Sequence, residues 1–126
     1  MSQILWVWGP AVALMAGVFV MSSIPEPPQV PGGMSDLSAH AIIYSVLGGL
    51  VLRAFAGARW LGVTVSRSAK ALAVTAIYGL SDEFHQSFVP GRVSDVRDLV
   101  ADVLGALAGV LLVWACSIVL SNRLTD

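Results

Sequence analysis

Long apolar stretches dominate the chain, and their lengths indicate helices that cross a membrane. A membrane-spanning helix needs about 20 mainly apolar residues. Four stretches approach this length, and they cover residues 4–21, 37–56, 69–88 and 99–120. The third is the least apolar, because its apolar part ends at Leu80. The pattern predicts an all-α integral membrane protein with four transmembrane helices and short loops, in which residues 1–126 form a single domain.

Composition supports the membrane interpretation and removes several classes of protein. Hydrophobic residues make up 56% of the chain and charged residues only 12%, whereas a soluble domain has about 25% charged residues. This excludes a soluble enzyme and a disordered segment. The net charge of −1 lacks the basic excess of a nucleic-acid-binding protein. Cys116 is the only cysteine, which excludes an internal disulfide and a thiolate metal site.

The basic residues predict how the chain is oriented in the membrane. Cytoplasmic loops of membrane proteins carry an excess of Lys and Arg. The link between the second and third apolar stretches is flanked by Arg53, Arg59, Arg67 and Lys70. We therefore expect a multi-pass protein of the cytoplasmic (inner) membrane with both termini in the cytoplasm. His40, about one turn into the second helix, then lies at the same outer membrane level as the residues that end the third.

Charged residues are concentrated after the third apolar stretch. Seven of the fifteen lie within one short window, and they are Asp82, Glu83, Arg92, Asp95, Arg97, Asp98 and Asp102. If the third helix continues to about residue 88, Asp82, His85 and Gln86 share one face through i, i+3 and i+4 spacing, and Glu83 points away. Asp98 and Asp102 are also four residues apart, and Gly105 and Gly109 continue their stripe. Glycines at this spacing allow two helices to approach closely.

Ionisable residues within a membrane are costly and are read as functional by default. We predict Asp82, Glu83, His85 and Arg92 as catalytic residues and His40, Gln86, Asp98 and Asp102 as binding residues. Carboxylates and histidine can transfer protons or hold a divalent cation, for which the candidate ligands are His40, Asp82, His85 and Asp102. Arginine can hold a phosphate or carboxylate through two hydrogen bonds.

Each of these assignments has a structural alternative. His40 and His85 could be hydrogen-bonded structural residues, and Arg92 could pair with a carboxylate. Asp98 could cap the fourth helix, where a carboxylate meets the positive end of the helix dipole. Asp95 and Arg97 are expected to form a solvated pair, and Tyr44 is expected to be an aromatic residue at the membrane interface.

One string is specific enough to indicate a family. Asp82-Glu83-x-His85-Gln86-x-Phe88-x-Pro90-Gly91-Arg92, followed by Asp98 and Gly105, resembles the VanZ-like family of small polytopic membrane proteins. Upstream, Asp36-x-x-x-His40-x-x-x-Tyr44 resembles the first element of that family, so the resemblance covers residues 36–109.

The chain departs from this family at two positions. Leu37 stands where the family often has lysine, which weakens anion binding at that helix start. Asp102 stands where it often has asparagine, which adds a negative charge and favours a cation. The family takes its name from a teicoplanin resistance factor, so the resemblance implies a cell-envelope context and no particular reaction.

These observations lead to one main hypothesis and two alternatives. We expect an outward-facing acidic pocket that acts on or binds an envelope lipid or its phosphorylated head group. Its partners would be membrane lipids and a phosphate-bearing or lipid-linked ligand, and the sequence is compatible with self-association. The first alternative is a non-catalytic accessory or lipid-binding protein. The second is an ion or proton pathway, which is disfavoured because the charges lie at one membrane level without a relay through the spans.

Overall fold

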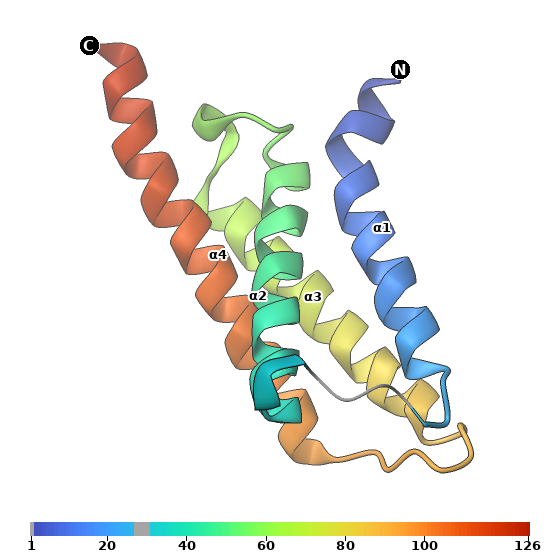
Figure 1. The fold of residues 1–126 in the computed structure, drawn as a ribbon. Coiled ribbons are helices and arrows are strands. Elements are labelled where there is room, and N and C mark those ends of the chain that lie inside the picture. The colour runs from blue at the N-terminus through green and yellow to red at the C-terminus, as the bar shows by residue number, and fades with distance from the viewer. Residues whose placement is uncertain (1, 27–30) are drawn as a thin grey trace.

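The computed structural model describes residues 2–26 and 31–126, and throughout these ranges the regular structure is helical. The four long helices run alternately in opposite directions, so the two termini lie at one end of the bundle (Figure 1). They are α1 (Gln3–Ser22), α2 (Asp36–Phe55), α3 (Val65–Gln86) and α4 (Val96–Thr125), with short 3-10 turns at Pro31–Gly33 and Trp60–Gly62. The predicted all-α class is confirmed.

The helix boundaries follow local capping residues. Side chains of Ser2, Ser35, Thr64 and Asp95 each accept a hydrogen bond from a backbone N–H in the first turn of the helix that follows. The predictions for α1 and α2 therefore agree with the structure to within one residue at each end. Thr64 starts α3 earlier than predicted, and Asp95 starts α4 earlier. The alternative that Asp98 caps α4 is wrong, because Asp95 occupies that position and Asp98 lies in the first turn.

Three of the helices are long and apolar enough to cross a membrane, namely α1, α2 and α4. Length and composition do not place α3 in this group, because it carries charged residues near both of its ends. The predicted fourth span is therefore not confirmed by these criteria. Short loops are not confirmed either, since residues 23–35 separate α1 from α2.

Helix α2 lies at the centre and packs against each of the other three (Figure 1). It approaches α4 most closely, because a Cβ atom on Gly105 would collide with the carbonyl of Ala41, and one on Gly109 with that of Ser45. The predicted close approach along this glycine stripe is confirmed. Tyr44 of α2 is 1% exposed within this core, so its prediction as an interface aromatic is wrong. It lies on the face of α2 that packs against its neighbours.

Candidate functional site

A cavity of about 540 Å³ lies at the end of the bundle opposite the termini. All four long helices and the α3–α4 loop contribute to it. Its polar lining comprises Ser22, Asp36, His40, Tyr44, Asp82, Gln86, Arg92 and Asp98. Apolar residues of α1 and α2, among them Leu14, Val18 and Ile43, line the remainder. The structure thus brings five of the predicted site residues to one cavity, and these are His40, Asp82, Gln86, Arg92 and Asp98.

Asp82 forms the centre of a hydrogen-bond network on one side of this cavity. Its Oδ1 accepts a 2.5 Å hydrogen bond from the hydroxyl of Ser22. Its Oδ2 accepts longer bonds from the hydroxyl of Tyr44 at 3.5 Å and from Nε2 of Gln86 at 3.4 Å. Donors from three helices therefore hold this buried carboxylate in one orientation.

Ser22 and Tyr44 belong to the site although the sequence did not single them out for it. Ser22 lies at the last position of α1, where a serine after an apolar stretch reads as a helix end. Tyr44 comes four residues after His40 and so shares its face of α2. The four-residue spacing from His40 was the sequence feature that could have placed Tyr44 in the site. Without it, a tyrosine near a membrane surface fits an interfacial position.

His40 pairs with Asp102 across the contact between α2 and α4. Nδ1 of His40 lies 2.7 Å from Oδ1 of Asp102, and the side chains are 22% and 0% exposed. Asp102 Oδ2 has no hydrogen-bond partner among the described residues. Asp102 therefore lies behind His40, where it orients the imidazole rather than lining the cavity.

Glu83 points away from Asp82, as the helical spacing predicts, and is held by the start of α4. Its Oε2 accepts hydrogen bonds from the Ser94 hydroxyl and from the backbone N–H of Asp95, both at 3.2 Å. Its Oε1 is buried and has no partner in the described part of the chain. One carboxylate oxygen is thus fixed and the other is free.

The structure also changes the set of candidate metal ligands. His40, Glu83 and Asp98 each offer one ligand atom, and these atoms lie within 4.8 Å of one another. Of the four ligands expected from the sequence, only His40 belongs to this group. The group draws one residue from each of α2, α3 and α4, and helix spacing alone did not predict that combination.

His85 lies outside this arrangement. Its ring stacks on Phe19 with centroids 4.5 Å apart, and its Nε2 lies 3.3 Å from the hydroxyl of Ser23. It is not among the cavity-lining residues. The prediction of a shared face therefore fits Asp82 and Gln86, which line the cavity, but not His85, whose ring packs on Phe19 of α1 instead. Its catalytic role stays a prediction.

Arg92 lies in the α3–α4 loop on the wall of the cavity. Its Nη2 donates a 2.7 Å hydrogen bond to the backbone carbonyl of Met21, while its Nε is buried without a partner. Within residues 2–26 and 31–126, no carboxylate forms an ion pair with it. By contrast, Arg97 pairs with Asp95 at 2.9 Å on the surface, and its hydrogen bonds lower the pKa of the Asp95 carboxyl.

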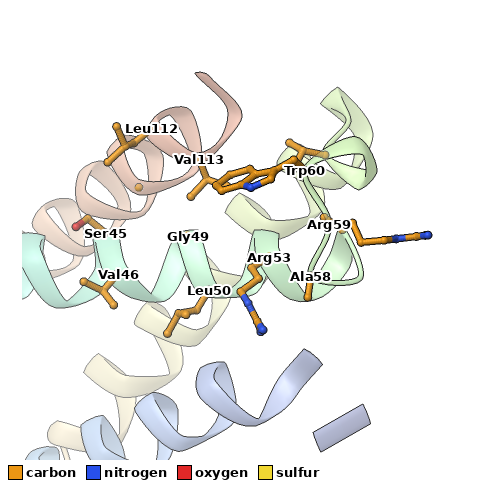
Figure 2. A pocket seen from close by; sticks show the side chains of 13 residues that line it. Ser45, Val46, Gly49, Leu50, Arg53, Ala58, Arg59, Trp60, Leu112 and Val113 are labelled. Atoms are coloured by element: carbon orange, nitrogen blue, oxygen red, sulfur yellow. The ribbon is translucent and has the colours of Figure 1, made fainter. Parts of the chain in front are cut away.

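A second cavity, of about 450 Å³, lies at the other end of the bundle (Figure 2). It is formed by α2, α4 and the turn at Trp60–Gly62, and Figure 2 shows the Trp60 ring extending toward Val113. Arg53 at its edge donates hydrogen bonds to the backbone carbonyls of Trp6 and Val7 and lies over the Trp6 ring. These contacts give the Arg53 guanidinium a structural role, which is to hold α1 against α2.

Comparison with known proteins gives one match. The model of the VanZ/LLP1 family matches residues 11–119, which extends the resemblance seen in the central motif to most of α1 and α4. Neither the curated proteins nor the solved structures contain a significant match to the chain.

Proposed function

The chain belongs to the VanZ/LLP1 family, and from this premise we propose that its cavity binds the phosphorylated head group of a cell-envelope lipid. The family suggests a cell-envelope and glycopeptide-resistance context. The observation that carries the proposal is the guanidinium of Arg92, which lines the cavity and has no carboxylate partner among the described residues.

Arginine is well suited to this role because its planar guanidinium binds phosphate oxygens through parallel hydrogen bonds. The bond from Nη2 to Met21 fixes the side chain in place. The buried Nε–H lacks a partner, and an unsatisfied buried donor costs about 1–3 kcal/mol. A phosphate oxygen that accepted this hydrogen bond would recover that free energy.

The cavity lining also fits a molecule that is polar at one end and apolar at the other. Arg92 supplies hydrogen-bond donors at the polar end, whereas Leu14 and Val18 on α1 supply apolar surface closer to the middle of the bundle. A volume of about 540 Å³ falls within the range of about 300–1,000 Å³ that is usual for small-ligand sites. The lipid chains would then follow the apolar side.

We propose further that α3 crosses the membrane and that the cavity faces outward. The polar residues Thr75, Asp82 and Glu83 are buried against the other helices, while Ile77 and Phe84 are exposed. A helix that hides its polar face inside a bundle and exposes its apolar face fits a bilayer in spite of its low mean hydropathy. The basic residues around the α2–α3 link lie at the end that holds both termini (Figure 1), which supports cytoplasmic termini.

Acid–base action on the head group is the second candidate function. It is favoured by the free, buried Oε1 of Glu83, because a carboxylate in such a place can accept a proton. Asp82 fits this role less well, since both of its oxygens already accept hydrogen bonds. Binding of the head group without a reaction does not require either carboxylate to be available for proton transfer. Binding is therefore the main proposal.

The test measures binding of short-chain phosphatidic acid to the full-length protein in neutral detergent containing divalent cations. Diacylglycerol, which lacks the phosphate, is the lipid control. We expect Arg92→Gln to weaken binding of phosphatidic acid at least about tenfold, the loss associated with a hydrogen bond to a charged group. Arg97→Gln, which changes an exposed arginine already paired with Asp95, should bind as the unaltered protein does. Equal affinity of both variants would contradict the proposal.

A further inference from the structure

We propose that His40, Glu83 and Asp98 bind a divalent metal ion, with Zn²⁺ the best fit, beside the cavity. This inference rests on the proposed function, because the metal would complete the site that receives the phosphate. The three residues come from three different helices, and Asp98 and His40 also line the cavity. A bound ion would therefore be reachable by a ligand in the cavity.

The geometry is close to that of a metal site. The three ligand atoms lie within 4.8 Å of one another. Tetrahedral ligands around zinc, at bond lengths of about 2.0–2.2 Å, are separated by about 3.4 Å. The side chains would thus need to close by about 1.4 Å at most to surround the ion. Movements of this size lie within the reach of small torsional changes in Glu and Asp side chains.

Glu83 provides independent evidence for a missing partner. It is only 5% exposed, and Ser94 and Asp95 hold its Oε2 while Oε1 is buried without a partner in the described chain. A buried carboxylate oxygen is costly unless it is hydrogen-bonded, ion-paired or bound to a metal. Because Oε2 is engaged, Oε1 is the oxygen that we assign to the metal, and a cation would satisfy it.

The pair between His40 and Asp102 has the form of a supported metal ligand. A histidine that binds a metal usually donates its other ring N–H to a carboxylate or carbonyl, which fixes the tautomer and the ring orientation. Here Nδ1 of His40 is bonded to Asp102, so Nε2 is the nitrogen left for a metal. Asp102 is a positioning residue in this arrangement.

The charge around the cavity also favours a cation. Five carboxylates lie in or directly behind its lining, and they are Asp36, Asp82, Glu83, Asp98 and Asp102. Arg92 is the arginine that faces them from the lining. Unpaired like charges at short range repel strongly in a partly buried site, and an anionic head group would add to the repulsion. A divalent ion would offset that repulsion and make phosphate binding favourable.

The donor set selects among divalent ions. One imidazole and two carboxylates suit Zn²⁺ and Mn²⁺, whereas Mg²⁺ and Ca²⁺ favour oxygen ligands throughout. Three protein ligands around zinc leave a fourth position open. A phosphate oxygen of the head group would occupy that position, next to the guanidinium of Arg92.

The test uses the full chain purified in detergent, stripped with EDTA and then titrated with Zn²⁺ alone. We expect about one zinc ion per chain by elemental analysis, with a raised melting temperature because the ion binds the folded state. Glu83→Gln, His40→Gln and Asp98→Asn should each weaken zinc binding at least about tenfold. Glu26→Gln, an exposed carboxylate, and His85→Gln, the histidine outside the cavity, are the matched controls.

The outcomes separate this inference from the proposed function. Wild-type zinc affinity in both Glu83→Gln and the variant of half-buried Asp98, Asp98→Asn, would overturn the metal site. Displacement of zinc by equimolar Mg²⁺ would overturn the preference for zinc. If metal-free protein binds phosphatidic acid as tightly as zinc-loaded protein, the claim that the metal completes the phosphate site is wrong, while head-group binding stands. If zinc binds as expected and phosphatidic acid does not, the metal site stands and the head-group proposal falls.

Discussion

Nδ1 of His40 lies 2.7 Å from Oδ1 of Asp102, beside one of the close approaches between the backbones of α2 and α4. One residue after His40, the carbonyl of Ala41 lies against Gly105, which follows Asp102 by one turn. The helix contact and the polar pair therefore support each other. The absence of a side chain on Gly105 allows the approach, and the pair provides a buried polar contact that fixes the relative position of the helices.

Replacement of Asp102 should separate the loss of charge from the loss of hydrogen bonding. Asp102→Ala leaves the Nδ1 of His40 without a partner, and we expect a loss of about 1–3 kcal/mol in the free energy of unfolding. Asp102→Asn retains an oxygen that can accept a hydrogen bond from a neutral imidazole, so its loss should be smaller. Equilibrium unfolding in mixed micelles measures both. Equal losses in the two variants would show that charge rather than hydrogen bonding dominates the pair.

The glycine stripe predicts an unusual sensitivity to a single methyl group. A Cβ on Gly109 would collide with the carbonyl of Ser45, so Gly109→Ala should destabilise the protein by about 1–3 kcal/mol through overpacking. Gly9→Ala is the matched control, because a Cβ there meets nothing within 4 Å and alanine favours the helix by about 0.5–1 kcal/mol. Opposite signs in thermal unfolding are expected. A neutral Gly109→Ala would mean that α2 and α4 do not pack this closely.

Two adjacent serines provide a direct test of the network around Asp82. Ser22 donates to this buried carboxylate, and removing a hydrogen bond to a charged group costs about 1.5–3 kcal/mol. Ser22→Ala should therefore lower stability by that amount. Ser23 is exposed, and Ser23→Ala should change stability by less than about 0.5 kcal/mol. If Ser22→Ala and Ser23→Ala unfold at the same denaturant concentration, the predicted contribution of Ser22 to stability is wrong.

Apolar length and capping residues explain why much of the fold could be predicted from the sequence. The bounds of α1 and α2 follow from apolar stretches that end at serines and at a proline-rich segment. The glycine stripe on α4 was visible as a four-residue spacing that begins at Asp98 and Asp102. The alternating direction of the helices placed His40 and the acidic window at the same end of the bundle, and the structure confirms this arrangement.

Rotation of each helix about its axis could not be predicted in the same way. Whether His85 faces the cavity depends on where α1 packs, because the His85 ring stacks on Phe19 of that helix. The meeting of His40, Glu83 and Asp98 likewise requires the rotation of three helices to be known together. The burial of Tyr44 follows from its neighbours on α3, among them Tyr78 and Asp82, rather than from its own position in the sequence.

Single-cysteine labelling tests whether α3 crosses the membrane. Cys116 is the only natural cysteine, so Cys116→Ala gives a background without a reactive thiol. Val93→Cys, in the loop after α3, should react with a membrane-impermeant maleimide in intact cells, because we place this loop outside. Leu61→Cys, in the turn before α3, should react only after permeabilisation. Both side chains are exposed, so each thiol is accessible from its own side.

The pair of labels distinguishes three topologies with one experiment. If α3 lies on the surface instead of crossing, Val93→Cys and Leu61→Cys will share the same accessibility in intact cells, and the proposed fourth span is wrong. If only Leu61→Cys reacts, α3 crosses in the opposite direction, and the cavity opens to the cytoplasm. Glu26→Cys reports independently on the loop after α1, which must match Val93→Cys because both loops lie at the same end of the bundle. Disagreement between these two positions would contradict the four-helix arrangement itself.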